Sequence, residues 1–593
     1  MSNTRREFLQ SMSAGVAAGT FLRPCSNAFG LTLKGGGKKK PNIIFVLSDT
    51  HRYNAMSFTS EFVDIKTPNM ERMKNEGVNF ANCFSTYPLC SPYRAMMQTG
   101  KWAWETGHID NHMDLQYRMD RSGPMEEKQR NATLGYMFTC AGYRTVHVGK
   151  WHQGFSENAQ PAGYELSYVW PGEFHEELRL RRNGAPHTCP DLNDMLGDGS
   201  GIKYSGVPAQ GKRPAYPTHP YKIIGETDQA LGILKNHNFE RGPLFMVLAL
   251  QDPHSPFDYE PGSKWPVGKW DKVQFADTEY SAGRQPGKPN LPPHALDAYD
   301  LAAIRFYPYD ERQEKHRELC WHYYASVTAT DDQLGRVMQA VENLPPEERD
   351  NTIVVYTSDH GGMNGNLGAE NGEKMYPNDA SSHVPLLVWG PGLIKNSGRT
   401  CDALMSTIDL FPTLCGLAGL KEDMTLSKNP DARECLNYLD SLDGIDHSRN
   451  ILDGTGPDPE SVLVYHLSNC NNETPAKPIH RSIITKDYLY AVQSHWHRGN
   501  KIDGFKAWNN DSGEWMLFNR KKDPYERNNL VNNPEADPVR EKLRAQLQGW
   551  LDKSERKEWV ARFVQQSHYA PEWKDEQAGR SELNPFDLSQ LLK

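Results

Sequence analysis

A cysteine and an arginine lie close together in the segment Cys90-Ser91-Pro92-Tyr93-Arg94. Ser91 is a favourable N-cap, Pro92 suits the first helical position and Gly100 suits a helix end, so the segment predicts a helix from Ser91 to Gly100. Arg94 then falls near the third helical position, where the helix dipole disfavours a cation by about 0.3–1 kcal/mol. That placement makes sense if an anion binds beside the thiol at the helix start. The alternative is a half-buried cysteine with a solvated arginine.

Polar residues follow four short apolar runs, 43–47, 145–148, 244–250 and 353–357, that predict β-strands. The residues after these runs are Ser48-Asp49-Thr50-His51, Gly149-Lys150-Trp151-His152, Gln251-Asp252-Pro253-His254 and Ser358-Asp359-His360. Because the carboxyl ends of parallel strands face one edge of an open sheet, these side chains should converge there with the helix at Ser91.

The residue types at this predicted edge indicate metal-assisted chemistry on an anion. Two aspartates and a histidine, Asp49, Asp359 and His360, favour a hard divalent cation with mainly oxygen ligands. Cationic or proton-donating groups come from Lys150, His152 and His254. Together they fit attack on a tetrahedral oxyanion ester, either a sulfate or a phosphate. Taken singly, each residue could instead be a helix cap, a turn former or a core histidine.

Two domains are predicted for a chain of 593 residues. Residues 41–455 alternate apolar runs, including 386–389, with helical patterns such as 313–343, which favours an α/β domain with a mostly parallel sheet flanked by helices. Residues 456–593 contain short strand-like pieces and a helical pattern at 538–551, which predict a smaller α+β domain. The segments 155–240 and 255–311 are rich in glycine, proline and polar residues and predict long surface insertions.

Composition excludes some classes of function. A net charge of −9 gives no support for bulk binding of nucleic acid. No run reaches the roughly 18 apolar residues that a transmembrane helix needs. The ten cysteines form no C-x-x-C pair and no zinc pattern, so most of them are expected to be small buried apolar residues.

The N-terminus resembles a twin-arginine export signal, because Arg5 and Arg6 precede a short run rich in alanine and glycine. Residues 1–30 are therefore predicted to be a signal peptide read by the twin-arginine export machinery, and residues 31–40 a flexible linker. A chance arginine pair on a cytosolic protein is the alternative. Export would place the protein in the periplasm or outside a bacterial cell, and folding before export would make the fold independent of disulfides.

Several segments resemble the sulfatase family, which uses formylglycine and has an alkaline-phosphatase-like fold. The Cys-x-Pro-x-Arg pattern at 90–94 and the following Thr99-Gly100-Lys101 resemble the family's first signature, and VGKWHQG at 148–154 resembles its second. Further matching segments follow in the same order: DPHSPF (252–257), YTSDHGG (356–362), STIDLFPTLCGLAG (406–419) and LFNRKKDPYERNNL (517–530). The resemblance spans residues 41 to 551. It implies that the smaller domain contains an antiparallel sheet.

The resemblance implies a modified nucleophile and a bound Ca²⁺ ion. A formylglycine-generating maturase would oxidise Cys90 to formylglycine (3-oxoalanine), an aldehyde that is hydrated at rest. One hydroxyl of the hydrate would attack sulfur, and the other would collapse to the aldehyde and expel sulfate. Calcium would be held by Asp49, Asp359, His360 and the modified Cys90.

Supporting roles are implied for five further residues. Arg94 would hold the hydrate and balance its charge, and Lys150 and Lys374 would clamp sulfate oxygens. His152 would assist the hydrate, and His254 would protonate the leaving alcohol.

The sequence departs from the family pattern in three places. His360 stands where several relatives use asparagine, and histidine is a softer donor than calcium prefers. Thr50 occupies a metal-ligand position where many relatives have aspartate or glutamine, so calcium would be held by two formal carboxylates rather than three. Lys374 itself matches the family pattern. In the same segment, however, Asn378, Asp379 and His383 stand where the family usually has tyrosine, glutamate and arginine.

The function that these features favour is that of an exported sulfatase acting on a sulfated carbohydrate. One alternative is a phosphoester or phosphonate monoester hydrolase on the same fold, and another is a non-catalytic binder of sulfated glycans. Four tryptophans could stack on sugar rings or simply pack inside the fold: Trp102, Trp104, Trp151 and Trp170. The basic run LRLRR at 178–182 could grip further sulfates, or it could be solvated.

Overall fold

The structure is a computed structural model of the chain. It describes residues 39–60, 63–109, 111, 133–153, 159, 162–168, 222–254, 274–275, 309–363, 374–426, 430–467, 480–493, 513–526 and 528–556. The predicted signal peptide, Trp170 and the basic run at 178–182 lie outside these residues.

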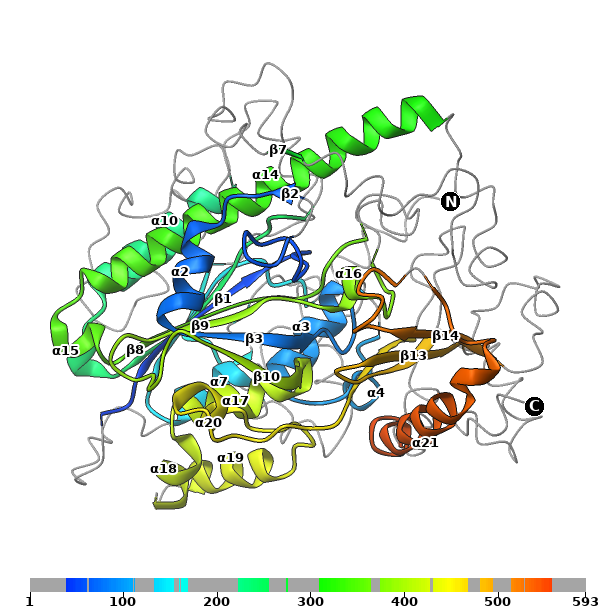
Figure 1. The fold of residues 1–593 in the computed structure, drawn as a ribbon. Helices are drawn as coiled ribbons and strands as arrows, with labels where there is room; N and C mark the ends of the chain where they lie inside the picture. The colour runs from blue at the N-terminus through cyan, green and yellow to red at the C-terminus, as the bar shows by residue number, and fades with distance from the viewer. Residues whose placement is uncertain are drawn as a thin grey trace, which may run out of the picture.

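An eight-stranded sheet with the order β10-β3-β9-β8-β1-β6-β4-β5 forms the centre of the molecule (Figure 1). Its strands in chain order are β1 (Asn42–Ser48), β3 (Val78–Phe84), β4 (Arg144–Gly149), β5 (Leu166–Tyr168), β6 (Leu244–Ala249), β8 (Thr352–Ser358), β9 (Leu386–Trp389) and β10 (Arg399–Ser406). Only β9 runs antiparallel to its neighbours in this sheet. The predicted mostly parallel α/β sheet is therefore confirmed.

Parallel pairing brings the polar strand ends to one edge. Strand β1 pairs with β6 on one side and β8 on the other, and the last residues of β1 and β8, Ser48 and Ser358, are register partners. The backbone N–H of Asp49 donates to Asp252 O at 3.2 Å, and the N–H of Asp359 donates to Ser48 O at 3.2 Å. These two hydrogen bonds continue the strand pairing into the loops that carry the predicted site.

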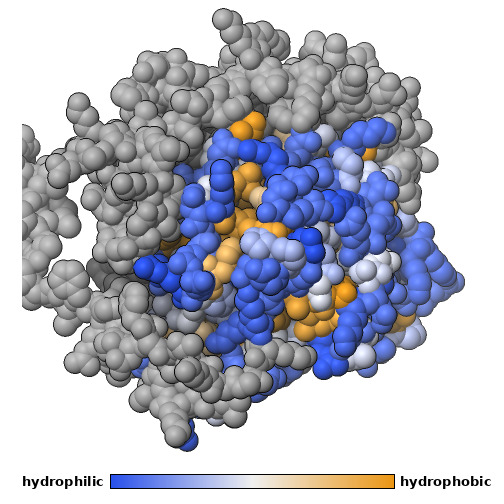
Figure 2. Space-filling model, turned by 90° about the vertical axis from the view of Figure 1, so that its left-hand side faces the viewer, coloured by the Kyte–Doolittle hydropathy of each residue, from blue (hydrophilic) through white to orange (hydrophobic). Residues whose placement is uncertain are grey.

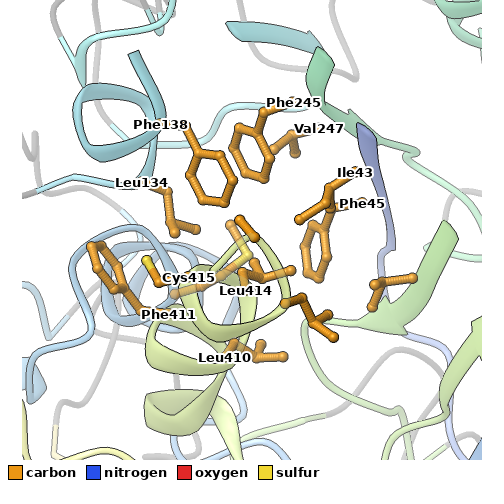
Figure 3. Close-up of a cluster of buried hydrophobic side chains, with 14 of the residues drawn as sticks. Ile43, Phe45, Leu134, Phe138, Phe245, Val247, Leu410, Phe411, Leu414 and Cys415 are labelled. Atoms are coloured by element: carbon orange, nitrogen blue, oxygen red, sulfur yellow. The ribbon is translucent and has the colours of Figure 1, made fainter. Parts of the chain in front are cut away.

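Helices cover both faces of the sheet because its central strands are apolar on both sides. One face, with Ile44 and Val46 of β1, packs against α2 (Pro68–Glu76), α10 (Lys222–Asn236) and α14 (Tyr309–Glu342). The other face, with Phe45 of β1, packs against α3 (Cys90–Thr99), α7 (Leu134–Cys140) and α17 (Leu410–Leu417). In Figure 3 the rings of Phe138 and Phe245 stack across this second interface, with a centroid separation of 3.8 Å.

A separate antiparallel sheet with the order β11-β12-β13-β14 follows in the chain. Its strands are β11 (Val462–His466), β12 (His480–Ile484), β13 (Tyr488–Gln493) and β14 (Glu514–Asn519). One face packs against α21 (Asp537–Ser554), and the other packs against Phe84 and Tyr376 of the larger part. Arg481 and Glu555, both buried, join β12 to the end of α21 through two hydrogen bonds of 2.9 and 3.0 Å. This confirms the predicted small α+β unit with an antiparallel sheet, while its boundary after residue 455 stays a prediction.

The remaining described elements are short. They are β2 (Val63–Asp64), α4 (Ala103–Thr106), η4 (Phe239–Arg241), β7 (Gln274–Phe275), α15 (Pro346–Arg349), α16 (Asp379–Ser382), η6 (Thr407–Asp409), α18 (Leu420–Leu426), α19 (Pro430–Asp440), α20 (Ser448–Leu452) and η9 (Pro534–Ala536).

One sequence-based expectation needs correction. The segment 155–240 is not wholly a surface insertion, because β5 extends the sheet and α10 buries Ile223 and Ala230 against it. Trp102, Trp104 and Trp151 are all buried, so packing is the correct interpretation of these three residues. Among the cysteines whose side chains the structure describes, Cys140 and Cys401 are only partly buried.

One face of the described part is mostly polar. Figure 2 views the molecule from the side on which α15 lies in Figure 1, and hydrophilic side chains there surround smaller hydrophobic patches. In the described part of the chain, no helix is both long and apolar enough to cross a membrane.

The carboxylate of Asp331 on α14 caps the start of α2. It accepts hydrogen bonds from the backbone N–H of Met70 at 2.7 Å, the backbone N–H of Asn69 at 3.1 Å and the side-chain amide of Asn69 at 2.9 Å. Thr67, the N-cap residue of α2, makes no such bond with its own side chain. A residue more than 260 positions away therefore satisfies the first N–H groups of this helix.

We predict that Asp331→Ala lowers the free energy of unfolding by about 1–3 kcal/mol, because it leaves buried donors without partners. Chemical denaturation of both proteins measures the difference. Gln339→Ala, at an exposed position of the same helix, should change the value by less than about 0.5 kcal/mol. Equal stability of Asp331→Ala and the wild type would contradict the capping role.

Candidate active site

All ten residues expected from the sequence lie together at the carboxyl edge of the large sheet. They come from the ends of β1, β4, β6 and β8, from α3 and from the segment before α16, and they are Asp49, Thr50, Cys90, Arg94, Lys150, His152, His254, Asp359, His360 and Lys374. The parallel sheet thus does what the sequence predicted, because it collects residues from distant segments at one edge.

Helix α3 begins two residues before Pro92, the predicted first helical position. Leu89 is the N-cap, Cys90 is the first helical residue, and Gly100 ends the helix with a left-handed φ of 65°. Ser91 is inside the helix, where its hydroxyl donates to His152 O at 2.6 Å and its backbone N–H donates to Asn111 Oδ1 at 3.0 Å. An N-cap role for Ser91 was therefore wrong, because a side chain from outside the helix satisfies the N–H group.

Arg94 is buried between the two aspartates. Its Nη2 donates to Asp359 Oδ2 at 2.9 Å and lies 3.4 Å from Asp49 Oδ2, and its Nη1 donates to Lys150 O at 2.9 Å. Arg94 is the fifth residue of α3, not the third. The anions that compensate its charge in this structure are these two carboxylates.

Thr50 adopts an unusual backbone conformation, with φ at 69°. Its hydroxyl donates to Asp49 Oδ1 at 2.8 Å, and its backbone N–H donates to Asp359 Oδ1 at 3.2 Å. Tyr323 on α14 donates to Thr50 O at 3.0 Å. A β-branched residue with positive φ is strained, so these contacts indicate that Thr50 orients both carboxylates. Whether it also binds the metal stays a prediction.

The Cys90 thiol lies in a strongly cationic environment. Lys374 Nζ lies 3.0 Å and His360 Nε2 3.1 Å from Cys90 Sγ. Burial by itself raises the pKa of the Cys90 thiol, but Lys150, Lys374 and His360 outweigh it and hold that pKa well below its ordinary value. Such an environment stabilises negative charge on the atom at this position.

His360 presents a ring nitrogen to the centre of the site. Its Nδ1 lies 2.7 Å from Gly361 O, which can only accept a hydrogen bond, so Nδ1 carries the proton. In the neutral ring the lone pair on Nε2 then faces Cys90 Sγ, Asp359 Oδ1 at 3.5 Å and Asp49 Oδ1 at 3.8 Å. This hydrogen bond orients the ring as carbonyl partners orient metal-bound histidines.

The donor set fits a divalent cation. One ligand atom from each of Asp49, Cys90, Asp359 and His360 lies within 4.8 Å of the others, and all four residues are buried. Burial and then Asp49 raise the pKa of Asp359. The Asp49 pKa is instead lowered, because Lys150 with His254 and Lys374 outweighs the upward effects of burial and Cys90. A divalent cation held by these residues would relieve the repulsion between the two carboxylates.

Two more basic side chains complete the site. Lys374 Nζ lies 3.2 Å from His254 Nε2, so the imidazole of His254 lies next to the lysine that contacts the Cys90 thiol. Burial, followed by Lys150, lowers the pKa of His152 to about 4, so this ring is neutral and can accept a proton.

The sequence did not predict how the segment after Lys374 is held. Asp379 makes two hydrogen bonds, of 3.0 and 2.9 Å, with Arg520 at the end of β14. Glu526 accepts from Asn378 Nδ2 at 2.8 Å and from the backbone N–H of Asp379. His383 stacks between the rings of Tyr53 and Phe84. The residues at 378 and 379 thus bind side chains that follow β14 of the second sheet, whereas His383 packs within the larger part.

Comparison with known proteins agrees with this geometry. The sequence model of the Sulfatase family matches residues 41–420. The chain belongs to the sulfatase family. Membership makes this sulfatase a sulfuric ester hydrolase, as the resemblance of its sequence motifs implied.

Two relatives and one solved structure are similar to this chain. The chain is 28% identical to an ulvan-active sulfatase of Formosa agariphila over 514 residues, which covers 86% of this chain and 80% of that protein. It is 27% identical to an N-acetylglucosamine-6-O-sulfatase of Bacteroides thetaiotaomicron, with 84% of each chain covered. The crystal structure of the phosphonate monoester hydrolase of Agrobacterium radiobacter superposes with a TM-score of 0.57 at 20% identity, covering 87% of this sulfatase and 96% of that chain. This last likeness shows a shared fold.

Glu526 should make the stability of this sulfatase depend on pH. Burial, and then the charge of Asp379, raises the pKa of Glu526 to about 8. The folded protein therefore keeps a proton that the unfolded chain releases near 4.5. The free energy of unfolding should fall as the pH rises from about 5 to about 8, by up to about 1.4 kcal/mol per pH unit from this group.

Glu526→Gln, which cannot release the proton, should show a flatter dependence than the wild type over the same pH range. Urea denaturation at a series of pH values measures both curves. Parallel curves for the two proteins would contradict the raised pKa.

Proposed function

We propose that the chain is an exported sulfatase that removes sulfate from a sulfated carbohydrate through formylglycine at Cys90 and a bound calcium ion. The observation that carries the proposal is the position of Cys90 Sγ, 3.0 Å from Lys374 Nζ and 3.1 Å from His360 Nε2, at the first residue of a helix. Helix N-termini and cations both favour an anion at this point.

Formation of formylglycine would convert the Cys90 side chain from –CH₂–SH to –CHO. The change adds water, releases hydrogen sulfide and removes two electrons and two protons, so it needs a maturase with a two-electron oxidant. In its hydrated form, the aldehyde supplies two hydroxyls on one carbon, which allows one to attack sulfur and the other to drive sulfate release.

The calcium ion would be held by Asp49, Asp359, His360 and the modified Cys90, whose oxygen suits a hard cation better than the thiol sulfur does. When bound, calcium supplies electrostatic polarisation of the sulfate oxygens. Arg94 supports the two carboxylates from behind, because its guanidinium binds their Oδ2 atoms and leaves the Oδ1 atoms turned toward the site.

Four residues would handle charge and protons during hydrolysis. Lys374 lies beside Cys90 Sγ and can bind a sulfate oxygen, while Lys150 is paired with Asp49 and lies near enough to Cys90 to attract the same anion. His152 is neutral and can take a proton from the nucleophile. His254, beside Lys374, can donate a proton to the leaving alcohol oxygen.

A sulfated carbohydrate is the substrate class that the relatives favour. One of them is named for activity on ulvan and another for removing a 6-O-sulfate from N-acetylglucosamine. Export is proposed because Arg5 and Arg6 form a twin-arginine pattern; both lie outside the described residues. It would bring the enzyme to the periplasm or beyond, where polymeric substrates are accessible.

Cys90→Ala should abolish sulfate release from aryl sulfate esters, because it removes the precursor of the nucleophile. Cys83→Ala, at a buried cysteine of β3, is the matched control and should retain turnover. Both variants and the wild type are produced together with a maturase, and peptide mass analysis measures formylglycine at residue 90. An unmodified thiol in an inactive wild type would instead favour a non-catalytic binder.

Calcium should stabilise the folded protein. Removal of metal with a chelator is expected to lower the thermal unfolding midpoint, and a calcium concentration of 100 times Kd should restore about 2.7 kcal/mol. Asp359→Asn should lose most of this calcium-dependent shift. A midpoint that does not respond to calcium in the wild type would contradict the assignment.

A phosphoester or phosphonate monoester hydrolase is the second candidate, favoured by the fold shared with the phosphonate monoester hydrolase. Parallel assays with aryl sulfate, phosphate and phosphonate esters separate the two. A higher kcat/KM for either phosphorus ester would favour this alternative.

A further inference from the structure

Met375, the residue after Lys374, has a backbone conformation that side chains rarely adopt. Its φ is 75°, in the left-handed region that favours glycine, and the residue is buried. A non-glycine residue in this region costs of the order of 1–3 kcal/mol and persists only when its surroundings hold it there. Some contact must therefore fix the backbone next to the lysine that faces Cys90.

Two hydrogen bonds hold Met375 at its two ends. Its N–H donates to Pro88 O at 3.0 Å, two residues before Cys90. Its carbonyl oxygen lies 3.1 Å from His480 Nε2. Because a carbonyl can only accept, Nε2 carries the proton of this histidine. Nδ1 of the same ring then accepts from the hydroxyl of Ser482, at 2.8 Å.

His480 comes from β12 of the second sheet and is fully buried. Burial lowers its pKa well below the ordinary value, so the ring is neutral and one orientation satisfies both nitrogens. The ring is thus a fixed donor aimed at Met375 O, supplied by an element 105 residues further along the chain. Its link to Lys374 runs through the backbone of the neighbouring Met375.

We propose that His480 is a positioning residue that holds Met375 in the left-handed conformation and thereby aims Lys374 at the nucleophile. The inference rests on the proposed function, because it takes Lys374 as the group that binds sulfate. The distances of Lys374 Nζ to Cys90 Sγ and His254 Nε2, 3.0 and 3.2 Å, both depend on where the backbone of this segment lies. The second sheet is therefore part of the active site's construction.

Contacts farther along the segment explain why the backbone conformation of Met375 depends on His480. Glu526 holds Asn378 and Arg520 holds Asp379, so the far end of the segment is fixed independently. Between Lys374 and that end, the carbonyl of Met375 faces His480. Loss of this hydrogen bond would release the strained residue while leaving the far anchor intact.

The test compares two polar replacements of the histidine. In His480→Gln the side-chain amide N–H can reach the place of Nε2, whereas in His480→Asn it reaches only the place of Nδ1. With turnover normalised to the formylglycine content at Cys90, His480→Asn should lower kcat by about 10- to 100-fold, and His480→Gln should stay within about threefold of the wild type.

Met375→Gly supplies the second half of the test. Glycine adopts the left-handed conformation without steric cost, so it should not need the hydrogen bond to stay there. Adding Met375→Gly to His480→Asn should therefore recover about tenfold of the lost kcat. His447→Leu, at another buried histidine placed before α20, is the control for loss of a core histidine and should keep the wild-type kcat.

Two results would overturn the proposal: equal kcat values for the Gln and Asn variants, or no recovery with Met375→Gly. The wild type, His480→Asn, Met375→Gly and the double variant are also compared by chemical denaturation, which requires no turnover. His480→Asn should lower the free energy of unfolding more in the wild-type background than in the Met375→Gly background. If the effect of His480→Asn on stability differs between the two backgrounds but the wild type shows no turnover, the proposed function is refuted and the role of His480 in holding Met375 is supported. If the effect is the same in both backgrounds, that role of His480 is refuted.

Discussion

The pairing of Arg94 with Asp49 and Asp359 is the interaction on which the site depends. The sheet brings two carboxylates together in a place without access to water, and each would be costly there without a cation. Arg94 meets both on their outer oxygens. Loss of one member of such a buried set costs about 3–5 kcal/mol, because it leaves uncompensated charge in the interior.

The same pairing places the nucleophile. Cys90 and Arg94 are four positions apart in α3, so they lie on one face of the helix. Once the guanidinium is bound to the strand ends, Cys90 must lie over the inward oxygens of the same carboxylates. The same contacts therefore fix both the position of the helix and the geometry of the predicted metal ligands. Thr50 adds to them by donating hydrogen bonds to both aspartates.

Much of this arrangement could be predicted from the sequence. The strand ends, the long helix α14 and the convergence of the ten site residues follow from apolar runs, the parallel-sheet rule and ordered motifs. The start of α3 was misjudged because local rules favour Ser91 as a cap, whereas Asn111 satisfies the backbone from outside the helix. The role of α10 was missed because its surroundings in sequence are rich in glycine and polar residues.

Residue types and their order along the chain determined by themselves that this protein carries two carboxylates, a lysine and histidines at the ends of parallel strands, and a thiol near the start of a helix. This suffices because strand direction alone sends those ends to one edge. Tertiary structure alone decided which partner each group meets. Arg94 meets carboxylates, Asp379 meets Arg520 and Met375 meets His480, and these hydrogen bonds join segments that share no local pattern. Such pairings depend on directions and distances of a few ångströms in a packed interior, which no spacing along the chain records.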